Sequence, residues 1–491
     1  MHDAEYTALD GLGMAAAVAD GQVSARELLE TALRRTKELN PKLNAVVRLL
    51  ERQATARLAE NLTGPFAGVP FLLKDLGQDF AGAPTTAGSR ARSGTPAGQH
   101  ATVVQRWLDA GLVIFGKTNT SEFGAKAVTE PELFGPARNP WDPRRTPGGS
   151  SGGAAAAVAA GIVPVAGASD GGGSIRIPAA CCGVFGLKPG RGLIPAGPRN
   201  GELINGSATH GVISRTVRDS AAMLDVLTGP DPLAPFASAF PAGSYLGEVG
   251  KDPGRLRIGW QTDSILGTAP APEATAALRD AANLLSGLGH EVARVRTEVY
   301  GPDTIRDFLV PFLVQIAVDV GEQGRGSRGR NGFELDTLLA AAAGRGIRAP
   351  ELSRAIENWQ RARIRLAEVH REFDVLLTPA LARAPLPIGS LRTPAAERAA
   401  ARAFLASGTV GLLTRLGVLD RIARRQLSWA PYTQLANITG RPAATVPLYR
   451  TGDGLPLGVQ FIAPPGGEGL LLRLAAELET ARPWDQPSVV L

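Results

Sequence analysis

Short apolar runs alternate with amphipathic stretches along most of this chain of 491 residues, and this alternation constrains the fold more than any other feature. Runs such as 69–73, 112–115 and 256–260 have the length of buried strands, and segments with helical periodicity lie between runs of this kind. Strands that alternate with helices form a sheet whose two faces are covered by the helices. The sequence therefore predicts an α/β protein with helices on both faces of a central sheet.

Two regions, 302–370 and 391–430, break the alternation and have a mostly helical pattern. We expect them to be insertions that pack over one edge of the sheet. Neither an internal repeat nor a long linker is visible, so a single domain is predicted. The domain covers 1–491, with a helical N-terminal part at 1–65, a core at 66–230 and variable helical insertions at 302–430.

The first long helix has a marked start and a marked stop. Ser24 is a candidate N-cap, and Glu27 completes a capping box in which each side chain accepts a backbone N–H of the other residue. Pro41 lacks an N–H group and clashes with the preceding turn, so we expect the helix to stop there.

Composition and charge argue against several classes of function. The net charge of +6 comes from scattered basic residues, and no run of Lys and Arg marks a nucleic-acid surface. We expect the segment 391–425, which is rich in Ala and Arg, to be a solvated helix face. The five His residues are far apart, so neither a metal site nor a cofactor is predicted. The expected partner is a small molecule, and a homodimer is left open.

The two cysteines, Cys181 and Cys182, are adjacent, so no disulfide framework is predicted. The N-terminal segment lacks the apolar core of a secretory signal. No apolar run reaches the roughly 18 residues that a membrane span needs, so no membrane association is expected. These features favour a cytoplasmic enzyme.

Lys74 ends the apolar run at 69–73. A lysine in such a setting is desolvated or paired. One interpretation is a salt bridge with the neighbouring Asp75. The other is an amine whose pKa is lowered by desolvation, so that it is neutral and can act as a base.

A glycine-rich segment at 146–161 surrounds Ser150 and Ser151 and leads into an Ala-rich helix. Free N–H groups at a helix start can hold an anion or a serine. A phosphate-binding loop would end in Gly-Lys-Ser/Thr, which is absent. The segment also fits the Gly-x-Ser-x-Gly pattern of α/β-hydrolases, although a loop precedes it where that pattern needs a strand. The partners left for that alternative are His210, His290 and His370.

Three consecutive glycines precede Ser174. If Ser174 is a nucleophile, the N–H groups of residues 171–174 can converge on one oxygen as an oxyanion hole, and side chains there would block a substrate carbonyl. The alternative is an ordinary glycine-rich turn in which Asp170 and Arg176 form an ion pair.

Together these three segments resemble the amidase signature family. The stretches "GVPFLLKD", "GGSSGG" and "SDGGGSIRIPAACCGVFGLKP" occur in this order, with Lys74 76 residues before Ser150 and Ser150 24 residues before Ser174. The resemblance runs through nearly the whole chain and is weakest across 302–430. It implies the amidase-signature fold: a central, mixed and twisted sheet flanked by helices on both faces, with helical insertions covering the active site.

The resemblance also implies a Ser–cis-Ser–Lys triad. Ser174 would be the nucleophile, Ser150 would follow a cis peptide bond and relay the proton, and Lys74 would be the base. The implied oxyanion hole consists of the N–H groups of Gly171, Gly172, Gly173 and Ser174. The implied supporting residues are Gly149, Ser151, Ser169, Asp170 and Arg176.

The predicted reaction is hydrolysis of the C–N bond of an uncharged amide through an acyl-enzyme on Ser174, with carbamates (urethanes) and esters as further substrates. The stretch "TEPELFGPARNPWDP" resembles the branch that contains nylon-oligomer enzymes, the 6-aminohexanoate cyclic dimer hydrolases. Two alternatives stay open: the A subunit of a glutamyl-tRNA amidotransferase, acting as a glutaminase, and a catalytically silent binding scaffold. We expect segments 305–318 and 403–419 to wall an apolar pocket over Ser174.

Overall fold

A computed structural model describes residues 1–235, 243–301, 303–323, 332–410, 418–484 and 487. Its centre is an 11-stranded sheet with the strand order β1-β3-β2-β4-β6-β5-β10-β11-β9-β7-β8. The strands are β1 Val46–Leu49, β2 Pro70–Lys74, β3 Val113–Thr118, β4 Val165–Asp170, β5 Phe185–Lys188, β6 Thr209–Ser214, β7 Arg257–Trp260, β8 Glu291–Arg294, β9 Val375–Pro379, β10 Ala443–Val446 and β11 Val459–Ile462.

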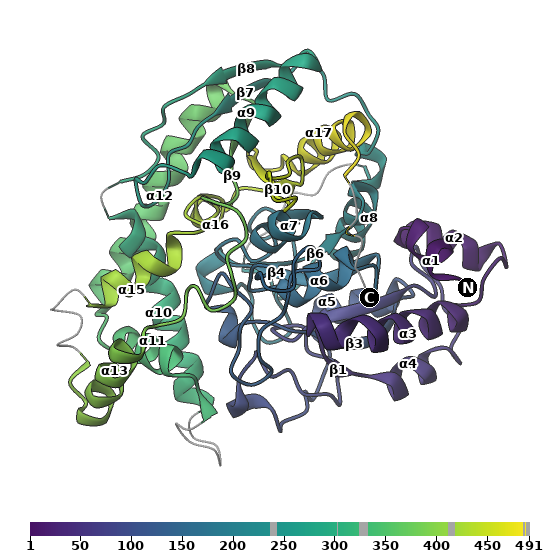
Figure 1. Ribbon diagram of the computed structural model, residues 1–491, viewed down its shortest axis with the longest axis horizontal. Helices are drawn as coiled ribbons and strands as arrows, with labels where there is room; N and C mark the ends of the chain where they lie inside the picture. Colours follow the sequence, from purple (N-terminus) through teal and green to yellow (C-terminus); the bar gives the residue numbers. More distant parts are fainter. Residues whose placement is uncertain (236–242, 302, 324–331, 411–417, 485–486, 488–491) are drawn as a thin grey trace.

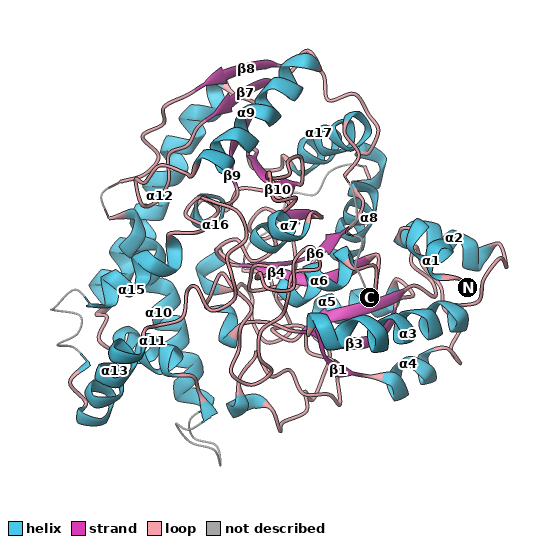
Figure 2. Cartoon of the chain, in the orientation of Figure 1, coloured by secondary structure: helices cyan, strands magenta, loops and turns pink. Residues whose placement is uncertain are grey.

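Helices lie on both faces of this sheet (Figure 1, Figure 2). They are α1 Asp3–Ala8, α2 Gly11–Ala19, α3 Ala25–Leu43, α4 Glu51–Arg57, α5 Thr102–Asp109, α6 Gly152–Ala159, α7 Arg176–Cys182, α8 Val217–Leu227, α9 Pro272–Gly287, α10 Thr304–Gln323, α11 Leu335–Arg345, α12 Ala349–Glu372, α13 Ala395–Ser407, α15 Val418–Leu427, α16 Gln434–Ile438 and α17 Glu468–Ala481.

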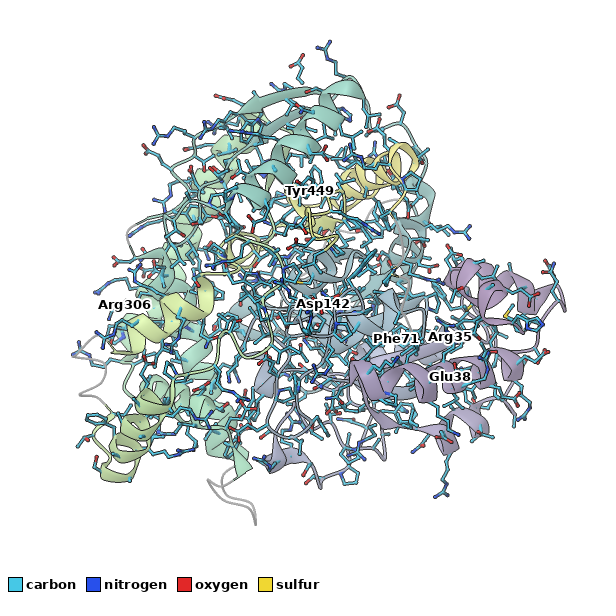
Figure 3. The ribbon with its side chains drawn as sticks, in the orientation of Figure 1. Arg35, Glu38, Phe71, Asp142, Arg306 and Tyr449 are labelled. Carbon is cyan, nitrogen blue, oxygen red and sulfur yellow. The ribbon has the colours of Figure 1, made fainter. Side chains whose placement is uncertain are left out.

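The sheet is mixed. β2 pairs in parallel with β3 and β4, and β7 pairs in parallel with β8 and β9, while the other pairs are antiparallel. Every residue of β2 is buried, because helices cover both faces, and this explains its continuous apolar run. Phe71 of β2 packs on Trp107 of α5 with 4.9 Å between ring centroids, and Figure 3 shows it inside the molecule. The predicted fold class is confirmed.

The N-terminal part differs from the prediction in two ways. The helix that starts at Ser24 has the expected capping box with Glu27, but it continues through Pro41 to Leu43. Only Lys42 and Leu43 follow Pro41 in the helix, so the helix ends two residues after the predicted stop. The part is also not wholly helical, because Val46–Leu49 pairs with β3 as an outer strand of the sheet.

The insertions are helical, as predicted, over their described residues. We call α10, α11, α12, α13 and α15 the helical layer; Figure 1 shows them together, at the end of the molecule opposite α1–α4. Trp359 of α12 donates to the carbonyl of Asp307 on α10, and Arg306 pairs with Glu351 on the outer side of the layer (Figure 3).

The packing of this layer over one edge of the sheet stays a prediction. Outside the layer, α10 contacts Ile204–Gly206 and α12 contacts α16. A cluster of Phe308, Trp359 and Ile438 joins α10 and α12 to α16. The apolar faces of the layer therefore pack toward the middle of the molecule, and the strand inside this part of the chain, β9, continues the sheet. Of the predicted wall segment 403–419, residues 411–417 lie outside the described residues.

Within the described residues, no helix is both long and apolar enough to cross a bilayer. The two cysteines of α7, Cys181 and Cys182, are buried free thiols. The cytoplasmic location stays a prediction.

Candidate active site

Lys74 is the last residue of β2, and its side chain is fully buried. Its Nζ atom lies 2.8 Å from Ser150 Oγ and 3.0 Å from Ser169 Oγ. The backbone N–H of Lys74 donates to Gln78 Oε1, and the Gln78 amide donates to the carbonyl of Ala168 on β4. These bonds hold the end of β2 against β4, so that the amine lies between two hydroxyl groups.

Burial lowers the pKa of Lys74 to about 7, although the negative charge of Asp170 opposes this shift. The cause is lost hydration, which disfavours the ammonium form. Near neutral pH, a large fraction of the amine is therefore neutral and can accept a proton from the Ser150 hydroxyl.

The salt bridge between Lys74 and Asp75, which was the alternative interpretation of Lys74, is not formed. The Asp75 carboxylate accepts the N–H of Thr86 at 3.0 Å and lies 4.0 Å from Lys117 Nζ. Asp75 therefore belongs to a separate buried contact between the loop after β2 and strand β3.

Ser150 follows a cis peptide bond with Gly149, as the family resemblance implied. Thr129 Oγ1 lies 2.9 Å from the carbonyl oxygen of Gly148 and 3.2 Å from that of Ser150, and it accepts the N–H of Gly152 at 3.0 Å. One threonine hydroxyl thus fixes the whole segment that presents Ser150 to Lys74.

Ser151 joins the loop around Ser150 to the loop around Ser174. Its N–H donates to the carbonyl of Ser174 at 3.3 Å, and its Oγ lies 3.3 Å from the carbonyl oxygen of Ser169. The two proposed serine hydroxyls are therefore carried by backbone segments that are bonded to each other.

Ser174 lies between β4 and α7 in a segment that we call the glycine turn, residues 171–174. The residue is 9% exposed, and its Oγ has no hydrogen-bond partner among the described residues. The hydrogen bond between Ser150 and Ser174 that a proton relay needs is therefore not made in this structure. Catalytic hydrogen bonds of free enzymes are often long and tighten when substrate binds.

The N–H groups of Gly171, Gly172 and Ser174 have no acceptor within the described part of the chain. The N–H of Gly173, in contrast, donates to Asp170 Oδ1 at 2.8 Å. Gly173 is therefore removed from the predicted set of oxyanion donors, because a carboxylate already occupies its N–H. Three N–H groups remain free to bind a developing oxyanion.

Asp170 and Arg176 are fully buried and form a two-pronged ion pair, with Nε–Oδ2 at 2.9 Å and Nη2–Oδ1 at 2.7 Å. Burial by itself would raise the pKa of Asp170, but the Arg176 charge outweighs it and holds that pKa well below its usual range. Asp170 also accepts the N–H of Ile175 at 3.1 Å. The pair is thus more than an ordinary ion pair, because it binds the backbone on both sides of Ser174.

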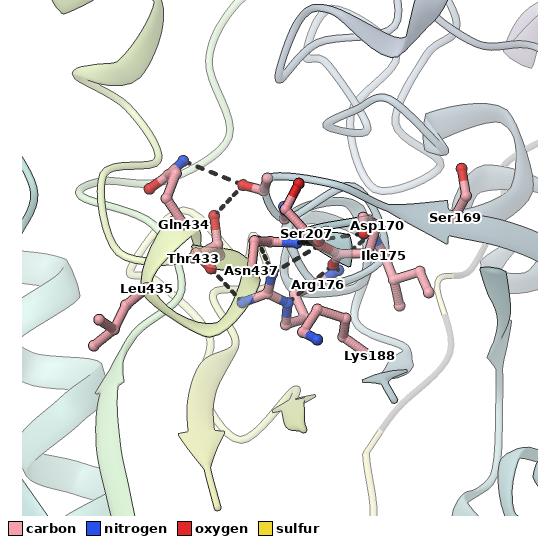
Figure 4. A network of polar contacts seen from close by, with 12 residues as sticks. Ser169, Asp170, Ile175, Arg176, Lys188, Ser207, Thr433, Gln434, Leu435 and Asn437 are labelled. Atoms are coloured by element: carbon pink, nitrogen blue, oxygen red, sulfur yellow. Dashed lines mark hydrogen bonds and ion pairs between the residues drawn. The ribbon is translucent and has the colours of Figure 1, made fainter. Parts of the chain in front are cut away.

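A second group of residues, which no sequence pattern predicts, holds the same turn. Figure 4 shows the residues of α16 and the turn before it around the ion pair. Asn437 donates to Asp170 Oδ1 at 2.9 Å, and Arg176 donates to the carbonyl of Thr433 at 2.7 Å. Thr433 and Gln434 both donate to the carbonyl of Gly172. These contacts span more than 250 residues of sequence, so no local pattern marks them.

Two aromatic rings of α10 lie against the glycine turn. A Cβ atom at Gly172 would come 2.9 Å from Phe308 Cζ, and one at Gly171 would come 3.3 Å from Phe312 Cζ. The rings themselves pack together with centroids 4.8 Å apart. The segment expected to wall the site, 305–318, therefore does lie at the turn, and glycine is needed there because the rings leave no room for a side chain.

The histidines proposed for a Gly-x-Ser-x-Gly hydrolase are engaged elsewhere or lack a bond to the serines. His290 bonds to Glu477 and to the N–H of Leu256, and His370 lies 3.2 Å from the carbonyl of Phe373. His210 forms no hydrogen bond with Ser150 or Ser151 within the described residues. The side-chain partner of Ser150 Oγ is Lys74.

Several known proteins are similar to this chain over nearly its whole length. The chain is 38% identical over 495 residues to 6-aminohexanoate-cyclic-dimer hydrolase of Pseudomonas sp. (strain NK87), covering 97% of this chain and 95% of that protein. The structure of 6-aminohexanoate cyclic dimer hydrolase with substrate superposes with a TM-score of 0.88 at 35% identity, covering 99% and 100% of the two chains. A bacterial aryl acylamidase superposes with a TM-score of 0.84 at 27% identity, covering 97% and 96%.

The match to a protein-family model covers both the fold and the candidate active site. The family model described as Amidase matches residues 27–472, which include every strand of the sheet, Lys74, Ser150, Ser174 and the residues of α16. The chain therefore belongs to the amidase signature family.

Proposed function

We propose that this protein is a serine amidase that hydrolyses the C–N bond of an uncharged small-molecule amide through an acyl-enzyme on Ser174. The observation that carries the proposal is the buried amine of Lys74, 2.8 Å from Ser150 Oγ, with its pKa lowered to about 7. An ammonium ion cannot accept a proton, whereas this amine can do so near neutral pH.

Acylation begins when Ser150 takes the proton of Ser174 and passes its own proton to Lys74. The Ser174 oxygen attacks the carbonyl carbon, and the electron pair moves to the carbonyl oxygen. The free N–H groups of Gly171, Gly172 and Ser174 stabilise that oxyanion. When the intermediate collapses, the C–N bond breaks, Ser150 protonates the leaving amine, and Lys74 returns its proton to Ser150.

Deacylation repeats the relay with water in place of Ser174. Ser150 takes a proton from the water, the resulting hydroxide attacks the ester carbonyl, and the acid leaves as Ser174 recovers its proton. The relay needs no histidine and no metal-bound water. Lys74, Ser150 and Ser174 are thus proposed as the triad, with Ser169 and Ser151 as supporting residues that orient it.

The proposed substrate class is an uncharged amide flanked by apolar carbons, with carbamates and esters as further substrates. The aromatic rings of Phe308 and Phe312 beside the glycine turn support this class, because apolar walls favour alkyl and aryl groups over a charged α-amino group. A relative named for a cyclic dimer of 6-aminohexanoate and a neighbour named an aryl acylamidase are consistent with it. We also propose a single domain over 1–491, since one sheet takes strands from 46 to 462.

The nucleophile is tested by Ser174→Ala with a fluorophosphonate probe. We expect the variant to lose both turnover and labelling, while the control Ser390→Ala keeps both, because Ser390 is an exposed serine whose hydroxyl bonds to the carbonyl of Pro387. A probe adduct on Ser150 or Ser151 in Ser174→Ala would support the nucleophile-elbow alternative instead. A wild-type chain that does not react would favour the silent binding scaffold.

The substrate class is tested with p-nitroanilides from acetyl to hexanoyl, together with a phenyl carbamate and glutamine. We expect kcat/KM to rise by about fourfold per methylene, from about 0.8 kcal/mol for each buried CH₂. Glutamine as the best substrate would instead favour the amidotransferase A subunit. A steady decrease with chain length would contradict the apolar surroundings of Ser174.

A further inference from the structure

The carbonyl oxygen of Gly172 accepts two hydrogen bonds from residues that are about 260 positions later in the chain. Thr433 Oγ1 donates to it at 2.6 Å and Gln434 Nε2 at 3.2 Å. Thr433 is fully buried and Gln434 is 3% exposed, so both donors are shielded from water, while Gly172 itself is half-buried. Gln434 Nε2 also donates to the carbonyl of Ala430 at 2.8 Å, which fixes the orientation of its amide.

The peptide group between Gly172 and Gly173 is thereby bonded at both ends. Its carbonyl accepts from Thr433 and Gln434, and its N–H donates to Asp170 Oδ1 at 2.8 Å. Because a peptide group is planar, bonds at both ends strongly restrict its orientation. The N–H groups of Gly172 and Ser174 belong to the two adjoining peptide groups, so their directions depend on this central plane.

A run of glycines cannot by itself hold its peptide groups in fixed orientations. Without Cβ atoms, the turn has access to most of φ/ψ space, and each glycine loses more conformational entropy on folding than any other residue. An oxyanion hole, however, works only when its donors are already aimed at the oxygen before the reaction. The order must therefore come from contacts outside the turn.

The packing around Thr433 shows how closely the two segments are matched. Gly173 has a φ of +123°, and a Cβ atom there would lie 2.2 Å from Thr433 Oγ1. The threonine hydroxyl thus occupies the space that a side chain at 173 would need. The absence of that side chain lets the hydroxyl reach the Gly172 carbonyl.

We propose that Thr433 and Gln434 are positioning residues that keep the oxyanion-binding N–H groups of the glycine turn aligned through the carbonyl of Gly172. The inference rests on the proposed function, because it assigns these N–H groups to the oxyanion. Neither side chain needs to touch the substrate. Their loss should therefore slow the chemical step more than it weakens substrate binding.

The test compares Thr433→Val, which keeps the shape and removes the donor, with Thr433→Ser, which keeps the donor. We expect Thr433→Val to reduce kcat for a p-nitroanilide by about 10- to 100-fold with KM changed less than about threefold, since small displacements of catalytic groups cost up to 10²-fold. Thr433→Ser should restore most of kcat, and the rate of fluorophosphonate labelling should follow kcat.

The matched control is Thr439→Val, which removes a buried threonine hydroxyl that bonds to the carbonyl of Leu435 at the end of the same helix. Thr439→Val should change kcat by less than about twofold relative to the wild-type chain. Losing such a bond is expected to lower the folding stability by only roughly 1 kcal/mol. Melting temperatures of all variants separate loss of fold from loss of alignment. If Thr433→Val does not fold, Gln434→Met takes its place, with an expected loss of the same kind.

Folded Thr433→Val and Gln434→Met variants with the kcat of Thr439→Val would overturn the inference. So would a Thr433→Val variant whose loss lies wholly in KM, or one that Thr433→Ser does not rescue. These outcomes are distinct from failure of the proposed function, which would appear as labelling that survives in Ser174→Ala.

Discussion

At the scale of single residues, the proposed chemistry depends on one lysine that is uncharged near neutral pH. Burial lowers the pKa of Lys74 to about 7, and the base must be neutral to act. We therefore expect kcat/KM for an uncharged anilide to fall as the pH decreases below about 7, because the protonated fraction of Lys74 then grows. A pH profile from 5.5 to 9.5 measures this limb.

Lys74→Arg is the matched variant for that profile. A guanidinium stays protonated throughout the range, so activity should be lost at every pH rather than shifted. A wild-type profile that stays flat between pH 5.5 and 9.5 would contradict the role of Lys74 as the base.

The ion pair between Asp170 and Arg176 beneath the glycine turn leads to a second prediction at the scale of single residues. Asp170→Asn keeps the shape of the side chain but leaves the fully buried charge of Arg176 without its partner. Breaking a buried pair in this way typically costs about 3–5 kcal/mol, so we expect a clearly lower urea midpoint as well as lost activity. The control Asp142→Asn alters a pair with the largely exposed Arg144 and should leave the midpoint nearly unchanged. Equal midpoints for the two variants would show that the buried pair is not stabilising the turn.

At the scale of elements, the helical layer and the glycine turn are packed together through α10. In Gly172→Ala the new methyl group meets Phe308 Cζ at 2.9 Å, so the turn or the ring must move, and kcat should fall. Phe308→Leu removes the far end of the ring, and we expect the double variant to recover part of the lost kcat. A double-mutant cycle on kcat measures this coupling.

Gly173→Ala is the control variant for that double-mutant cycle. Its φ of +123° is unfavourable for any residue with a Cβ atom, so Phe308→Leu should not rescue it. Additive losses in Gly172→Ala with Phe308→Leu would mean that the contact between α10 and the turn does not affect the reaction.

The elements differ in how well the sequence predicts them. β2 and β3 were predicted because they are buried on both faces, so that their first residues appear as the apolar runs 69–73 and 112–115. β1 was missed because Val46–Leu49 follows α3 after a short turn at Asn44, and its half-exposed pattern continues that of the helix. Pro41 was predicted to end the helix, which in fact ends two residues later, at Leu43.

The residues of the site differ in the same way: some are marked by their local sequence, and others reach the site only through folding. Lys74, Ser150 and Ser174 stand in unusual local surroundings, which is why a family resemblance identifies them. The occupied N–H of Gly173 could not be foreseen, since it depends on how the backbone turns back on Asp170. Thr433, Gln434 and Asn437 have no unusual neighbours in sequence, and only the folded chain brings them to the turn.

At the scale of the whole molecule, three buried lysines make stability depend on pH. Burial lowers the pKa of Lys74 and Lys188 to about 7 and that of Lys117 to about 8, from an ordinary 10.5. Between these values and 10.5 the unfolded chain binds more protons than the folded chain, so stability rises with pH through that window. We expect the melting temperature to be higher at pH 9 than at pH 7.

Lys188→Met should flatten this slope by removing one of the three groups, whereas Lys251→Met, at a mostly exposed position, should leave the slope unchanged. Melting curves at matched ionic strength measure both. A melting temperature that falls from pH 7 to pH 9 in the wild-type chain would show that these lysines remain charged inside the fold.

The distance along the chain between the glycine turn and its partners has a consequence for protein synthesis. The three residues of the proposed relay are all made within the first 174 positions, while Thr433 and α16, which hold the turn, are made at 433–438. Because domains generally fold as units, the glycine turn gains these partners only after α16 has left the ribosome. A nascent chain that has not reached α16 therefore lacks the bonds that hold the turn around the proposed nucleophile. We therefore expect a product truncated before α16 to be an inert fragment rather than an unselective esterase.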